Sequence, residues 1–152
     1  MFAKTFGCVR FVYNWALETK SRTWKEEKKN ISCYELQKLM VATLKKENEW
    51  LSEVNSQSLA RSIVNLDTAY QNFFKHGKLF PNYKNKHDKQ KFHNPQNCSV
   101  DFEQGIINIP KAKGIKAVFH RTFNGSIKGV TISKEKDGRY YASILVDTAT
   151  QP

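Results

Sequence analysis

Hydrophobic residues in the first part of the chain recur at helical spacing. Apolar and aromatic side chains follow one another at steps of three and four residues, which predicts a helix from the N-terminus to about Lys29. After Asn30, the sequence Ser32-Cys33-Tyr34-Glu35 has the form of a capping box. Leu36 then opens the apolar stripe of a second helix.

A third helix has the clearest pattern. Asn55 and Ser56 can cap its start, and Gly77 stands where a left-handed C-cap belongs. The apolar stripe between these caps consists of Leu59, Ile63, Leu66, Tyr70 and Phe73. This spacing indicates a helix that is committed to packing along one face.

The second half of the chain has the pattern of short strands. The runs that predict strands are Ser99–Phe102, Ile106–Ile109, Ala117–Phe119, Lys128–Ser133 and Tyr140–Val146. Asp137-Gly138 lies between the last two as a hairpin turn. The expected fold class is α+β, with about three helices in an N-terminal bundle followed by a small antiparallel β-barrel-like sheet. The predicted domains are a helical unit over residues 1–76, a basic connector over 77–92 and a β unit over 93–148.

Composition adds a strong positive charge. The 152 residues include 25 Lys and Arg against 14 Asp and Glu, a formal charge of +11. The apolar runs are too short to span a bilayer, and the start does not have the pattern of a secretory signal, so the sequence favours neither a membrane protein nor an exported one. Cys8, Cys33 and Cys98 are scattered and odd in number, which favours free thiols in a reducing cytoplasm. Nucleic acid is the first candidate partner, before an anionic protein or membrane surface, although the protein could also be merely basic.

The connector combines cations with aromatic rings. From Lys75 to Lys91 it holds six lysines and one acid, Asp88. Lysines can neutralise phosphates and rings can stack on bases. The candidate binding residues here are Lys78, Tyr83, Lys84, Lys86, Lys89 and Lys91. The alternative is a solvated linker, with Phe73 and Phe74 belonging to the core.

The start of the third helix is a second candidate surface. Ser56, Gln57 and Arg61 can reach phosphates or base edges beside free backbone N–H groups. The alternative is a simple N-cap with polar neighbours that face solvent.

The sequence shows no catalytic constellation. Carboxylates of the second half fall mostly at turns or strand ends, whereas a two-metal nuclease needs several on adjacent rigid elements. The histidines and cysteines lack the paired spacing of a zinc module. We therefore expect no cofactor, no metal and no catalytic residue.

Several ordered motifs resemble the OrfB/TnpB proteins of bacterial insertion sequences. These motifs are Phe6-Gly7-Cys8-Val9-Arg10-Phe11-Val12-Tyr13-Asn14, Trp50-Leu51-Ser52-Glu53-Val54, Asn65-Leu66-Asp67-Thr68-Ala69-Tyr70-Gln71-Asn72-Phe73-Phe74-Lys75 and Phe80-Pro81-Asn82-Tyr83-Lys84-Asn85-Lys86. They are spread over most of the chain.

The resemblance implies a specific function. Full-length members look like RNA-guided DNA nucleases, with a helical recognition unit inserted into a wedge-like barrel and a RuvC-type nuclease after it. By that resemblance the helix start and Gln37 would face DNA that flanks the target. The barrel and the connector would hold structured guide RNA. The chain itself would be a noncatalytic, truncated portion of a transposase-like protein, located in the bacterial cytoplasm at the nucleoid.

Two other functions remain open. One is a conventional helix-turn-helix DNA-binding module of a transposase, with the third helix in the major groove. The other is a protein-interaction or dimerisation module whose charge is incidental. Since family members carry a further strand before Phe6-Gly7, we also expect an open sheet edge through which two copies could form a homo-oligomer.

Overall fold

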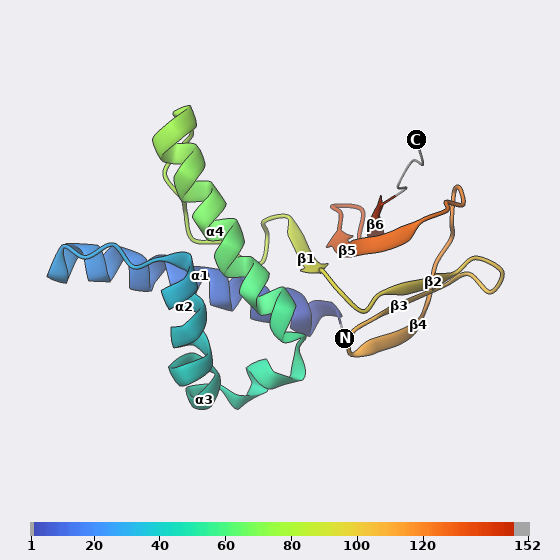
Figure 1. Cartoon of the computed structure of the whole chain (residues 1–152), viewed down its shortest axis with the longest axis horizontal. Coiled ribbons are helices and arrows are strands. Elements are labelled where there is room, and N and C mark those ends of the chain that lie inside the picture. The colour runs from blue at the N-terminus through green and yellow to red at the C-terminus, as the bar shows by residue number, and fades with distance from the viewer. Residues whose placement is uncertain (1, 148–152) are drawn as a thin grey trace. The chain divides into compact units, whose positions relative to one another are not determined.

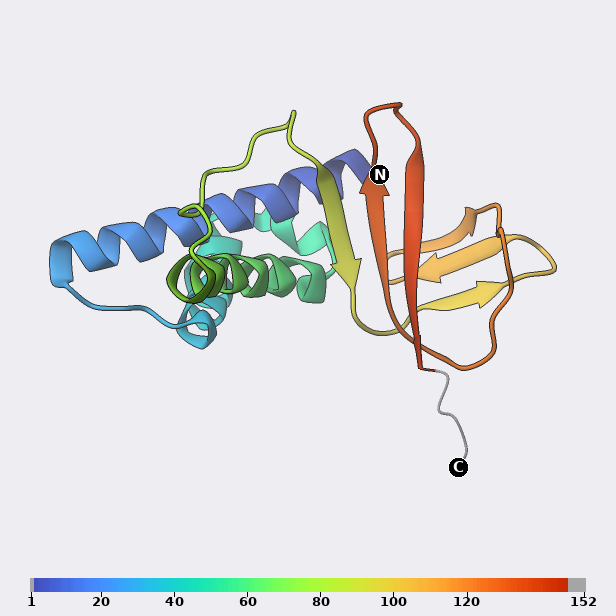
Figure 2. The ribbon, with the colours of Figure 1, turned by 90° about the horizontal axis from the view of Figure 1, so that it is seen from above.

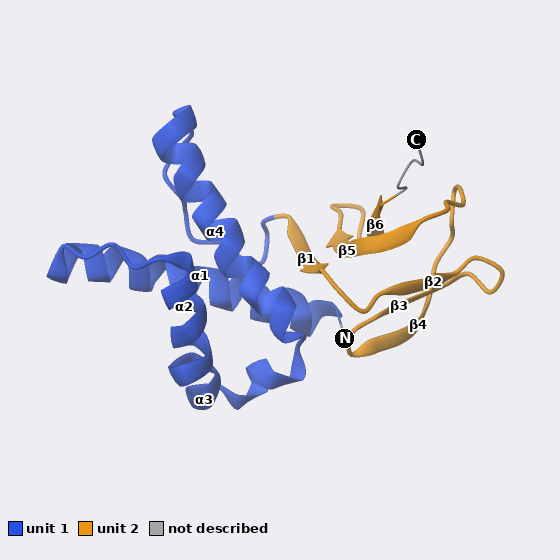
Figure 3. Cartoon of the chain, viewed as in Figure 1, with its two compact units in different colours: residues 1–88 blue, residues 89–152 orange. Residues whose placement is uncertain are grey.

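The computed structural model describes residues 2–147. The chain divides into two compact units, residues 1–88 and residues 89–152 (Figure 3). The first unit is helical and the second is built from strands. This arrangement confirms the α+β class.

The first unit contains two long helices with shorter turns between them. Its elements are α1 (Phe2–Glu27), α2 (Cys33–Leu39), the π-helical turn η1 (Met40–Leu44), α3 (Lys45–Glu47), the 3-10 turn η2 (Glu49–Glu53) and α4 (Ser56–His76). Helix α4 packs across α1, and α2 packs against α4 (Figure 1). Val12, Ala16, Leu59 and Ile63 are completely buried between the helices.

The predicted caps are present. The Glu35 backbone N–H donates to Ser32 Oγ at 3.1 Å at the start of α2. The Gln57 N–H donates to Asn55 Oδ1 at 3.2 Å at the start of α4. Gly77 ends α4 with a φ of 64°, in the left-handed region. These helix ends follow local sequence signals.

The second unit consists of two antiparallel three-stranded sheets. Its strands are β1 (Gln90–Asn94), β2 (Ser99–Asp101), β3 (Ile106–Ile109), β4 (Ala112–Lys116), β5 (Ser126–Lys134) and β6 (Tyr140–Asp147). The sheet orders are β1-β5-β6 and β2-β3-β4 (Figure 2). Over residues 2–147 these sheets do not close into one barrel, so the barrel-like arrangement is corrected to two small sheets.

Two strands differ from the sequence prediction. Residues 117–119 are not a strand; β4 lies earlier, at Ala112–Lys116, where Ile115 pairs with Ile107 of β3. The basic run ends in a strand, β1, where Phe92 pairs with Ile132 and is buried. Both strands are polar in sequence and are stabilised by pairing with distant segments, which a local pattern does not reveal.

Candidate nucleic-acid interface

The basic segment after α4 is fastened to α1 by one asparagine. Asn14 Nδ2 donates to the Lys84 carbonyl oxygen at 2.8 Å, and the Lys84 N–H donates to Asn14 Oδ1 at 2.7 Å. The Lys84 ammonium lies 4.5 Å from the centre of the Tyr13 ring, within the range of a cation–π contact. Pro81, three residues before Lys84, is buried. The segment is therefore ordered against the helical unit at Lys84.

Other predicted residues of this segment are exposed. Lys78 and Lys86 face solvent, and the Tyr83 side chain is 57% exposed. Asp88 accepts a hydrogen bond from the Asn85 N–H at 2.9 Å, so its carboxylate stabilises a turn. The exposed cations and the ring of Tyr83 are available to phosphate and base, respectively.

Lys89 and Lys91 belong to the second unit. Lys89 Nζ lies 3.6 Å from Glu135 Oε1, with both side chains well exposed. Because an exposed ion pair contributes little, a phosphate can replace Glu135 at small cost. Lys91 is exposed on β1 opposite Ser133 of β5.

The strand register reveals a polar sheet face that the sequence analysis missed. One row across the sheet joins Lys91, Ser133 and Tyr141, because directly opposed residues share a face. In the next row, His93 Nδ1 lies 2.8 Å from Thr131 Oγ1. This face could be recognised only once β1 was known to pair with β5.

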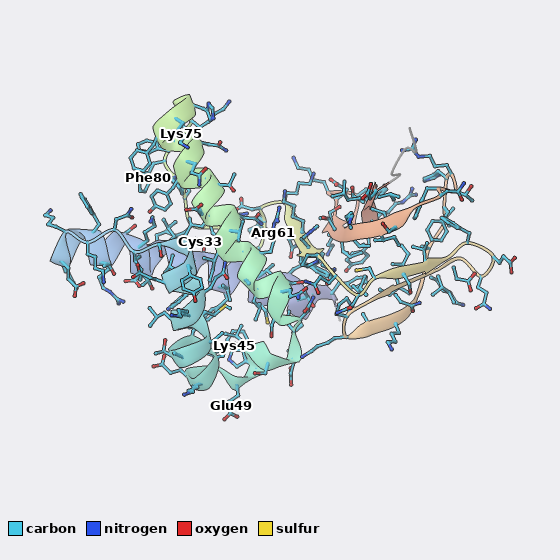
Figure 4. The ribbon with its side chains drawn as sticks, viewed as in Figure 1. Cys33, Lys45, Glu49, Arg61, Lys75 and Phe80 are labelled. Atoms are coloured by element: carbon cyan, nitrogen blue, oxygen red, sulfur yellow. The ribbon has the colours of Figure 1, made fainter. Side chains whose placement is uncertain are left out.

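The start of α4 brings together three of the predicted residues. Ser56 and Arg61 are exposed, and Gln57 lies one turn before Arg61 on the same side of the helix. Ser56 Oγ accepts a hydrogen bond from Lys45 Nζ at 3.0 Å, so Lys45 of α3 joins this surface (Figure 4). Sequence analysis missed Lys45, since no local pattern relates it to a helix that begins eleven residues later.

Gln37 lies on a different helix from the other predicted residues. It is half-buried on α2, and its side-chain amide donates to Cys33 Sγ at 3.5 Å. Burial raises the pKa of the Cys33 thiol above its ordinary value, which keeps the thiol neutral near pH 7. The hydrogen bond from Gln37 to Cys33 is thus directed within α2, while α2 itself packs against α4.

Two further observations concern metals and membranes. Among the described residues, no group of three or more His, Cys, Asp and Glu side chains is placed to hold a metal ion. No helix within residues 2–147 is long and apolar enough to cross a bilayer.

Comparison with known proteins identifies the family. A family model described as a helix-turn-helix domain, of the OrfB type, matches residues 1–29. A protein of Streptomyces pristinaespiralis named "Putative RNA-guided DNA endonuclease" is 30% identical over 154 residues, which is 99% of this chain and 38% of that protein. InsQ of Escherichia coli K12, named in the same way, is 32% identical over 146 residues, 93% of this chain and 35% of InsQ. The chain belongs to the OrfB/TnpB family of insertion-sequence proteins.

The matches cover only part of the OrfB/TnpB relatives, and the family model covers only the first helix. The chain spans 38% and 35% of the length of these two OrfB/TnpB relatives. The virulence protein VsdF of Salmonella dublin is 33% identical over 94 residues, 55% of this chain and 79% of VsdF. Of the residues matched by the helix-turn-helix description, 2–27 form one long helix, α1.

Proposed function

We propose that this OrfB/TnpB chain is the nucleic-acid-binding portion of an RNA-guided DNA endonuclease, which holds guide RNA and DNA flanking the target. The observation that carries the proposal is the basic segment fastened by Asn14. From Thr68 to His87 the sequence contains no acidic residue, and Lys78 and Lys86 are exposed. An ordered, acid-free segment presents cations to a polyanion without an internal competitor.

The RNA contact is proposed to be mainly electrostatic. Lysine ammonium groups bind phosphates as point charges and read no sequence, so binding should be sensitive to salt and tolerant of sequence. Lys89 and Lys91, which belong to the second unit, are proposed as further phosphate contacts. The names of the two endonuclease relatives support an RNA partner.

The test is a salt titration of RNA binding. Each phosphate contact on a single strand contributes about 0.7 to the slope of log affinity against log salt. Replacing Lys78, Lys84 and Lys86 with Gln removes three contacts and should flatten the slope by about 2.

The matched control removes the same charge elsewhere. Lys25, Lys28 and Lys29 are exposed at and beyond the end of α1. Their triple Gln variant should keep a slope close to that of the unchanged protein. Equal slopes for the two triple variants would show that net charge alone drives binding, and the proposed RNA surface would be wrong.

We assign the DNA contact to the start of α4. Ser56, Gln57 and Arg61 share its first turns, and Lys45 is hydrogen-bonded to Ser56. Gln37 lies on α2, which packs against α4. Gln57→Ala with Arg61→Ala should weaken binding to a duplex that carries the target-flanking motif. The same variant should leave single-stranded RNA binding unchanged; an equal loss for both nucleic acids would contradict separate surfaces.

A conventional helix-turn-helix reader is less well supported. The α4 stripe of Leu59, Ile63 and Leu66 is buried in the helical unit. The connection from α2 to α4 includes η1, α3 and η2, far longer than the usual three or four residues. A protein-interaction module remains the other alternative, and absence of salt-dependent binding to any nucleic acid would favour it.

We further propose that this chain alone binds nucleic acid without cutting it. We also propose that it acts at the bacterial nucleoid, in the cytoplasm. Two-metal cleavage stabilises the attacking and leaving oxygens through ions held by clustered carboxylates. Incubation of labelled duplex with Mg²⁺ or Mn²⁺ should leave it intact. Cleavage that a single Asp or Glu substitution abolishes would contradict this.

A further inference from the structure

Four aromatic rings form a cluster where α4 ends and the chain turns back. The Phe80 ring meets Tyr70 edge-on at 5.4 Å and Phe73 edge-on at 5.2 Å. Phe74 lies 5.0 Å from Phe73 and stacks on Tyr70 at 6.4 Å with an interplanar angle of 20°. Gly77 makes the reversal possible, because its left-handed backbone lets the chain return along the helix. Figure 4 shows Phe80 beside the last turns of α4, close to Lys75.

The cluster has a buried base and an exposed outer part. Tyr70 is buried, and the Lys20 ammonium lies 5.0 Å from its ring centre. In contrast, Phe74 is 74% exposed and Phe80 is 47% exposed. The alternative that placed Phe74 in the core is therefore wrong: the ring faces solvent, one turn after Tyr70, the last buried position of the α4 stripe. Its neighbours hold the ring in place, which lowers the entropy cost of binding a ligand on it.

The surroundings of the exposed rings are cationic. Lys75 directly follows Phe74, and Lys78 stands two residues before Phe80; both are exposed. The acid-free stretch from Thr68 to His87 contains the whole cluster. A planar ring beside ammonium groups suits a planar base attached to a phosphate, whereas a purely apolar partner would gain nothing from the charges.

We infer that Phe74 and Phe80 form a stacking platform for unpaired nucleotides of single-stranded RNA, with Lys75 and Lys78 receiving the adjoining phosphates. This inference rests on the proposed function, RNA binding, and adds to it a surface that binds unpaired bases. Base-paired RNA would bind this surface poorly, because its bases already stack on one another.

The test separates stacking from charge. Phe74→Leu with Phe80→Leu keeps apolar side chains at exposed positions and removes the aromatic faces. Affinity for an unstructured RNA oligonucleotide should fall by at least the loss of one stacked base, about five-fold to about 150-fold, since stacking contributes about 1–3 kcal/mol per base. The salt slope should not change, because every lysine remains. The fluorescence of a 2-aminopurine in the oligonucleotide should be quenched by the unchanged protein and less by the variant.

A matched control lies in the same loop. Leu79 is 88% exposed and cannot stack on a base. Leu79→Ser should leave RNA affinity unchanged. If it weakens binding as much as the double Leu variant does, the patch is a general apolar contact, as in docking of a protein segment, and the inference is overturned.

The remaining outcomes are also decisive. Thermal unfolding should show each variant cooperatively folded, with a small loss of stability for the double Leu variant, because Phe80 gives up its ring contacts with Tyr70 and Phe73. If RNA binds with the expected salt slope but the double Leu variant binds equally well, the platform is wrong and the proposed function stands. If the unchanged protein binds no RNA, both are wrong.

Discussion

At the scale of single residues, Asn14 connects two segments that are far apart in the sequence. Its amide is both donor and acceptor, and it satisfies the N–H and the carbonyl of Lys84 at once. An amide is the side chain that can do this with one planar group. The position of the basic segment on α1 thus depends in part on one polar residue of a helix whose neighbouring positions are mostly apolar.

We predict that Asn14→Ala destabilises the helical unit. The two hydrogen bonds between Asn14 and the Lys84 backbone are lost, and the expected cost in the free energy of unfolding is about 1–3 kcal/mol. Asn14→Asp is the matched variant: a carboxylate still accepts from the Lys84 N–H but cannot donate to its carbonyl. The free energy of unfolding of Asn14→Asp should lie between that of the unchanged protein and that of Asn14→Ala. Urea unfolding measures this order, and an Ala variant as stable as the unchanged protein would contradict it.

At the scale of elements, the end of α4 depends on a left-handed residue. Gly77 has a φ of 64°, and a Cβ there would meet nothing within 4 Å, so only the backbone would be strained. We predict that Gly77→Ala lowers stability by about 1 kcal/mol and that Gly77→Asn lowers it less, since Asn tolerates this conformation better.

A second glycine provides a control of opposite sign. Gly7 lies inside α1, and a Cβ there would make only an ordinary contact, 3.8 Å from an Arg10 guanidinium nitrogen. Gly7→Ala should therefore raise stability by about 0.5–1 kcal/mol through helix propensity. Thermal melts of the variants test both signs. A destabilising Ala at both positions would mean that space, and not backbone conformation, decides the outcome.

At the scale of the whole molecule, β6 is the outer strand of its sheet. In the sheets of residues 2–147 it pairs with β5 on one side, and Tyr141 and Leu145 are exposed. Between Tyr141 and Val146 the strand has no charge and no proline, the usual protections of an edge. We predict reversible association of two copies at high concentration.

Analytical ultracentrifugation over a concentration series tests this association. Leu145→Lys places a charge on the edge strand and should shift the protein toward the monomer. Lys136→Gln, in the turn before β6, is a control that should change little. A monomer at every concentration would refute pairing through this edge.

The sequence by itself determined the helices, their caps and the family. Helical periodicity, the Ser32 and Asn55 caps and the Gly77 end depend on residues within a few positions of each other, so local chemistry suffices. The candidate site was only partly visible in this way: the lysines and Arg61 follow from composition, but their neighbours do not.

Only the tertiary structure decided which distant residues meet. Lys45 reaches Ser56, Asn14 holds Lys84, and Phe74 turns outward although its spacing resembles a core position. Strand β1 forms by pairing with β5, which lies about forty residues later in the sequence. The polar sequence of β1 does not by itself indicate a strand. The physical reason is the same in each case: these contacts derive their stability from partners brought close by folding, and no local pattern encodes the partner.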